Sequence, residues 1–218
     1  MAIVALPSNA WQLGWLAWFC LEKGRTGKSS ARRSARCALS VSAKYLRLSA
    51  RRFGLVAKGD DLPIPSRVVR YVPSGRMRKH EDDDNIIFGP NPNAFEQRAT
   101  DDYLSVTWCQ YFEGSKDQQL RCSIEAIRNS KLEVKPKACF CIAETDSLFA
   151  AIQDAGKHGR AVYHPEDDNL AHAGIYGIAP DELQLLARLA DEVWSDYLTK
   201  GAADALPTSD CAKSANVE

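Results

Sequence analysis

The charge of this chain is divided by position, and the division marks where a compact domain can begin. Residues 1–58 hold eleven Lys or Arg and a single acid, whereas residues 59–218 hold seventeen Lys or Arg against twenty-seven Asp or Glu. Such a basic segment is typical of an arm, a targeting segment or a surface-binding tail joined to an ordinary domain. We therefore predict three parts: a basic, poorly ordered extension over 1–62, a globular domain over 63–201 and a disordered tail over 202–218.

Composition and hydropathy favour a globular protein outside the membrane. Apolar residues make up 45% of the chain and charged residues 26%, which suffices for a buried core. The longest apolar run, over 11–21, is shorter than the roughly eighteen residues that a membrane-spanning helix needs. We therefore predict no transmembrane segment and a cytoplasmic location.

The cysteines do not follow the pattern of a disulfide framework. There are seven of them, an odd number, at irregular positions. Free thiols in a reducing compartment are the simplest interpretation, so we expect no structural disulfide. Cys139 and Cys141 are separated by one residue, which is closer than the spacing of zinc knuckles, and they are predicted to be core thiols.

Hydrophobic periodicity predicts strands and helices in irregular alternation. The predicted strands are 66–72, 103–106, 132–144, 161–164 and 171–178, and the predicted helices are 118–127, 145–155 and 180–198. No regular strand-helix-strand rhythm is visible, which argues against a doubly wound parallel sheet. The sequence therefore predicts one compact α+β domain with a mixed or antiparallel sheet and a long C-terminal helix.

The densest group of chemically active side chains lies in residues 164–172. Two histidines, His164 and His172, flank an acidic run that includes Asp168. If they end neighbouring strands, His164, Asp168 and His172 could bind a divalent metal, or the histidines could perform acid-base catalysis. The alternative is an acidic surface turn whose histidines cap strands, because spacing alone does not show that ligands converge.

A second enzymatic interpretation rests on two predicted strands. Nicotinamide-cleaving transferases place an arginine or histidine on one strand and a serine or threonine on another to hold the dinucleotide, and a glutamate completes the site. Arg70, Ser105 and Glu144 are the candidates in this chain. The alternative is that Arg70 and Ser105 face solvent on strands of period two.

The order of features from residue 68 to about residue 198 resembles an uncharacterised family of small bacterial proteins with no assigned activity. The residues that carry the resemblance are Arg70, Pro73, Phe95, the run Tyr103-Leu104-Ser105-Val106, Asn169, the run His172-Ala173-Gly174-Ile175, and Gly177. The resemblance implies one domain and a bacterial source, and it supplies candidate positions without a reaction. The basic N-terminal segment has no counterpart in it.

Three function classes stay open from the sequence. The first is a bacterial cytoplasmic accessory or binding protein. The second is an enzyme that depends on His172, with His164, Arg70 or Ser105 in the site, and is either metal-assisted or nicotinamide-cleaving. The third is a nucleic-acid binder whose basic arm contacts phosphates through Arg32, Arg33, Arg51 and Arg52.

Overall fold

The computed structural model describes residues 55–83, 86–97 and 101–218. The chain divides into two units, Met1–Arg52 and Phe53–Glu218, and all of these residues belong to the second unit. The four arginines behind the nucleic-acid prediction lie outside the described residues. Within the described part of the chain, no helix has the length and apolar character that crossing a membrane requires.

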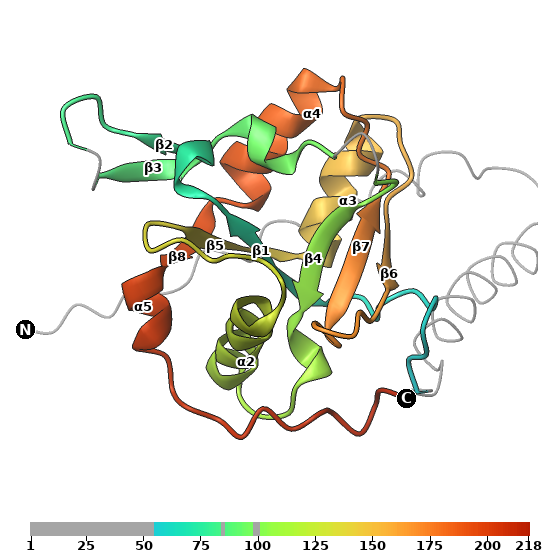
Figure 1. Ribbon diagram of the computed structural model, residues 1–218. Helices are drawn as coiled ribbons and strands as arrows, with labels where there is room; N and C mark the ends of the chain where they lie inside the picture. Colours follow the sequence, from blue (N-terminus) through green and yellow to red (C-terminus); the bar gives the residue numbers. More distant parts are fainter. Residues whose placement is uncertain (1–54, 84–85, 98–100) are drawn as a thin grey trace, which may run out of the picture. The chain divides into compact units, whose positions relative to one another are not determined.

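A six-stranded antiparallel sheet forms the centre of the second unit (Figure 1). Its order is β6-β7-β4-β1-β5-β8, and every pair of neighbours is antiparallel. The strands are β1 (Arg67–Val72), β4 (Leu104–Trp108), β5 (Cys139–Glu144), β6 (Arg160–Tyr163), β7 (His172–Tyr176) and β8 (Asp196–Thr199). A two-stranded hairpin of β2 (Met77–Lys79) and β3 (Ile87–Pro90) lies beside it.

Helices cover the two faces of the sheet (Figure 1). On one face lies α2 (Lys116–Asn129), and on the other lie α3 (Thr145–Asp154) and α4 (Leu183–Arg188), which continues into a π-helical turn, η4 (Leu189–Val193). The shorter helical segments are η1 (Ser74–Arg76), η2 (Pro92–Phe95), η3 (Cys109–Tyr111) and α5 (Lys200–Asp204).

Successive side chains of the central strands alternate between two hydrophobic clusters. Val69 of β1 and Phe140 of β5 pack with Ile124 of α2. Their sequence neighbours Val68 and Cys141 belong to the cluster of α3 and α4. All five are buried. Because successive side chains of a strand point to opposite faces, one apolar run can support both layers.

The predicted class is confirmed: the protein is an α+β domain, and its sheet is antiparallel. The C-terminal helix is shorter than predicted, because it spans 183–193 and the chain then enters β8. Leu198 lies opposite Phe140 in the ladder between β8 and β5. Pairing at the free edge of β5 outweighs the helical spacing of the apolar residues in this segment.

The predicted domain boundary at residue 63 is wrong, because the segment before it belongs to the domain. Val56 and Leu62 are buried. The backbone N–H of Leu62 donates to the carbonyl of Ala161, which continues the sheet contact beyond β6. These contacts place residues 55–62 in the domain.

The predicted disordered tail is also wrong, because the end of the chain packs against the domain. Val217 is buried and forms a parallel bridge with Val56. Lys213 pairs with Phe112, and the N–H of Ser214 donates to the carbonyl of Tyr111 at 2.7 Å. Small polar residues without periodicity gave no sign of these contacts, which are made mainly by the backbone.

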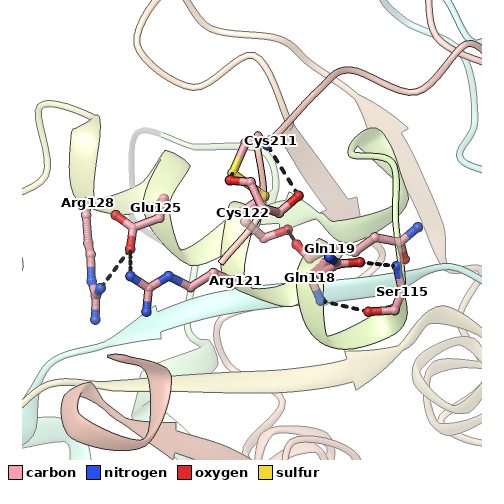
Figure 2. The surroundings of a disulfide bond; sticks show 10 residues. Ser115, Gln118, Gln119, Arg121, Cys122, Glu125, Arg128 and Cys211 are labelled. Atoms are coloured by element: carbon pink, nitrogen blue, oxygen red, sulfur yellow. Dashed lines mark hydrogen bonds and ion pairs between the residues drawn. A yellow bond between two sulfur atoms is a disulfide. The ribbon is translucent and has the colours of Figure 1, made fainter. Parts of the chain in front are cut away.

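A disulfide bond fixes this tail to α2, contrary to the expectation of free thiols. Cys122 of α2 is bonded to Cys211, 89 residues away in the sequence, with a Cα–Cα distance of 5.3 Å (Figure 2). Among the described residues, Cys109, Cys139 and Cys141 are free and buried, and burial raises the pKa of Cys109 and of Cys141 to about 12. Counting cysteines could not reveal which two meet in space.

Reducing this disulfide should destabilise the domain. Because the bond closes a long loop, reduction should lower the free energy of unfolding by about 2–4 kcal/mol. Denaturant titration with and without a reducing agent measures the effect. A C122S/C211S double variant is the control: its stability should be low and should not respond to the reductant. An equal response in the double variant would contradict the assignment.

Candidate functional site

The central sheet opens between β1 and β4. The two strands pair only at Val68 with Trp108 and at Val69 with Thr107. If the same register continued, Tyr71 would lie opposite Ser105, but the pairing has stopped by that point. A cleft of about 630 Å³ occupies this opening, and Tyr71 and Ser105 both line it.

Arg70 of β1 reaches across the opening. Its Nη1 donates to the carbonyl oxygen of Ser105 at 2.6 Å, and its Nε donates to the carbonyl oxygen of Ala94 in η2 at 3.0 Å. The guanidinium therefore takes the place of a backbone partner for β4 and connects three segments at the cleft. A planar group with fixed donors suits this bridging role better than a lysine ammonium would.

Charged groups of both signs surround the cleft. The basic side chains are Arg70, Arg76 and Lys131, and the acidic ones are Glu96, Asp101, Glu166 and Asp168. They come from different segments, including the end of α2 and the loop between β6 and β7. A cavity of this size with several polar groups is typical of a site for a small molecule or cofactor.

A serine and a histidine form a hydrogen-bonded pair on the cleft wall. Ser105 Oγ lies 2.6 Å from His172 Nε2, and His172 Nδ1 lies 2.8 Å from the carbonyl oxygen of His164. Thr107 opposes His172 in the ladder between β4 and β7, so Ser105 is its diagonal neighbour on the same face. The sheet register thus brings together two residues that are 67 positions apart.

Tyr103 packs over this pair. Its ring stacks on His164 with a centroid distance of 5.4 Å and meets the edge of His172 at 5.8 Å. His164 Nε2 is also bonded to the hydroxyl of Tyr176 at 2.9 Å. Burial raises the pKa of Tyr103 and lowers the pKa of His164, so both side chains favour their neutral forms.

The position of Tyr103 depends on a glycine beneath it. A Cβ at Gly174 would lie 2.7 Å from Cγ of Tyr103, which is closer than two non-bonded carbon atoms can approach. Gly174→Ala should therefore displace the ring and lower the free energy of unfolding by about 1–3 kcal/mol. Gly75→Ala is the matched control, because nothing lies within 4 Å of its Cβ position. Equal melting temperatures for the two variants would refute this role.

The loop between β6 and β7 is tied to both sides of the cleft. Asp168 accepts a hydrogen bond from the backbone N–H of Lys131 at 2.7 Å, and this bond lowers the pKa of the Asp168 carboxyl. Asn169 is buried, and its Nδ2 donates to Thr107 Oγ1 at 2.9 Å. These bonds fix the acidic loop beside the Ser105–His172 pair.

The structure does not assemble the predicted metal ligands His164, Asp168 and His172. Both ring nitrogens of His172 are engaged, by Ser105 and by the His164 carbonyl, and the Asp168 carboxylate is turned to Lys131. Across the described part of the chain, no group of three or more His, Cys, Asp or Glu side chains is arranged to hold a metal ion. The loop agrees better with the alternative interpretation, an acidic turn whose histidines cap strands, since its histidines bond to neighbouring strands.

Of the nicotinamide-cleaving set, the structure brings Arg70 and Ser105 together but not Glu144. Glu144 forms an ion pair with Arg67 at 3.0 Å and is not among the residues that line the cleft. Glu166 is the carboxylate beside the pair, with its Oε1 3.6 Å from His172 Nδ1. Sequence reasoning missed Glu166, Arg76 and Lys131 as site residues, because only the loop paths bring them to the opening.

Comparisons of the chain with protein-family models, with curated proteins and with solved structures find no match. The resemblance to a bacterial family stays a prediction.

Proposed function

We propose that this chain is an enzyme that binds a nicotinamide dinucleotide, NAD, and cleaves its bond to nicotinamide. The observation that carries the proposal is the opening between β1 and β4, which Arg70 spans to reach Ser105. An arginine and a serine on two adjacent strands, facing one cleft, match the arrangement that such transferases use to hold their dinucleotide. Glu166 takes the part predicted for Glu144.

The cleft suits an elongated anionic ligand with an aromatic end. Its volume of about 630 Å³ is in the range of sites that enclose ligands larger than a single small metabolite. Arg76 and Lys131 can face the two negative charges of a pyrophosphate, and guanidinium groups bind such oxygens with paired donors. Tyr103 offers an aromatic surface beside the reacting end.

Cleavage of the bond to nicotinamide requires a negatively charged side chain beside the ribose. When the bond between the ribose carbon and nicotinamide breaks, its electron pair leaves with nicotinamide and neutralises the ring, and positive charge develops on the ribose. The Glu166 carboxylate would stabilise that charge. Water, the simplest acceptor, then forms the new bond to carbon and releases one proton to solvent.

A pair of glutamate variants tests this proposal. Full-length protein is incubated with NAD, and released nicotinamide is measured by chromatography. Glu166→Gln should slow release by about 10²–10³-fold, the usual effect of removing one charge-stabilising group. Glu144→Gln, the matched control outside the cleft, should leave the rate near wild type. NAD binding without release would favour the accessory-protein alternative, and neither binding nor release would refute the proposal.

The remaining predictions about setting and partners stay proposals. Nucleic-acid binding through Arg32, Arg33, Arg51 and Arg52 rests on composition, and low-salt binding assays with and without these charges would test it. A bacterial, cytoplasmic location rests on the resemblance and on hydropathy. The Cys122–Cys211 disulfide counts against a reducing compartment, because such bonds persist mainly in oxidising ones.

A further inference from the structure

The protonation of His172 can be assigned from its partners. A carbonyl oxygen carries no proton, so the contact between His172 Nδ1 and the His164 carbonyl requires the hydrogen on Nδ1. In the neutral ring, Nε2 then bears a lone pair. Ser105 must donate its hydroxyl hydrogen to that lone pair across the 2.6 Å contact. The hydroxyl is thereby aligned for loss of its proton to the imidazole.

The pair combines a buried base with an accessible nucleophile. His172 is only 4% exposed, whereas Ser105 is exposed on the cleft wall. The edge contact with Tyr103 and the backbone bond to His164 hold the imidazole in place. The Glu166 carboxylate, 3.6 Å from Nδ1, can stabilise the imidazolium that forms when the proton is taken. This is the usual relation of nucleophile, base and orienting group.

The backbone of Ser105 supplies a donor beside its own hydroxyl. In an extended strand, the N–H and C=O of one residue point to the same side. The Ser105 carbonyl points toward β1, where it accepts from Arg70, so its N–H also points into the opening where β1 and β4 do not pair. An N–H in this position can stabilise negative charge on an electrophile that the hydroxyl attacks.

We infer that Ser105 is a nucleophile, activated by His172, that accepts an acyl or phosphonyl group from an activated electrophile. This inference goes beyond nicotinamide release and rests on the contacts of Ser105 and His172, independently of the proposed function. With a fluorophosphonate, the Ser105 oxygen forms a bond to phosphorus, and the phosphorus–fluorine bond breaks. Fluoride leaves with that electron pair, and the hydroxyl proton passes to His172 Nε2. No oxidant, reductant or further reactant is needed.

Labelling of full-length protein with an alkyl fluorophosphonate tests the inference, with intact mass and peptide mapping as readouts. Wild type should gain one adduct, on Ser105, and Ser105→Ala should gain none. His172→Gln should label about 100-fold more slowly, as expected for loss of a general base. Ser130→Ala is the matched control: Ser130 also lines the cleft, but its hydroxyl donates to the Ile127 carbonyl instead of a histidine.

Each outcome decides the question. An adduct on Ser105 that depends on His172 supports the inference, whether or not NAD is cleaved, so failure of the proposed function is distinguishable from failure of the nucleophile assignment. No adduct on folded wild type, an adduct on Ser130, or an unchanged labelling rate in folded His172→Gln would overturn it. If the His172 variant does not fold, the site of the adduct in wild type and in the two serine variants still decides.

Discussion

Replacing Arg70 by Met is expected to reduce nicotinamide release by about 10²–10³-fold. Methionine keeps an unbranched apolar stem of the same kind but is shorter and carries no charge and no donors. The carbonyls of Ser105 and Ala94 would lose the guanidinium that joins them, and the opening between β1 and β4 would lose the side chain that bridges it. Because water can reach the cleft, the free energy of unfolding should fall by only about 1–2 kcal/mol.

The matched control is Arg67→Met on the same strand. Arg67 pairs with Glu144 at the far end of β1, away from the cleft lining, so its loss should leave release close to the wild-type rate. Arg70→Lys separates charge from geometry: a lysine keeps the charge but cannot make the two fixed contacts, and partial activity is expected. Equal rates for Arg67→Met and Arg70→Met would contradict the role given to Arg70.

The sequence predicted most strands and α2 because period-two and helical spacing report directly on burial. Val68 and Val69 signalled a strand, and the same residues now support both layers of the core. The spacing from Leu183 to Tyr197 also fits a helix, yet Tyr197 lies in β8 opposite Cys141. Local pattern could not show that β5 has an unpaired edge to which this segment can add, since that edge exists only once the sheet has formed.

The candidate site was predictable in some of its residues but not in its assembly. Arg70, Ser105 and His172 all stand out in the sequence, yet they suggest two separate sites. The structure joins them, because the ladder between β1 and β4 stops after Val69 and the ladder between β4 and β7 continues past Ser105. Where a ladder stops depends on the packing of whole strands, and no residue type records it. Glu144 failed as a candidate because the register between β1 and β5 places it opposite Arg67, outside the cleft lining.

The segment η2, which presents the Ala94 carbonyl to Arg70, is held in place by Trp194. Trp194, at the end of η4, is fully buried and stacks on Phe95 of η2 with a centroid distance of 5.3 Å. Phe95 follows Ala94, whose carbonyl accepts from Arg70 Nε. Trp194→Ala should therefore lower the free energy of unfolding by about 3–5 kcal/mol, the usual cost of deleting a large buried aromatic side chain.

Trp194→Phe separates the packing of the ring from its polar group. The indole Nε1 is buried and has no hydrogen-bond partner among the described residues, so phenylalanine removes an unsatisfied donor while keeping most of the stacking surface on Phe95. We expect a cost of only about 1–2 kcal/mol, because relief of that donor offsets part of the cavity left behind. Denaturant titrations of the two variants measure both values.

Under conditions where Trp194→Ala is still folded, its nicotinamide release should also be reduced, since η2 would no longer hold the Ala94 carbonyl against Arg70. If Trp194→Phe were as unstable as Trp194→Ala, the indole N–H would have to be making an essential bond, and η2 would not be held by ring stacking as described.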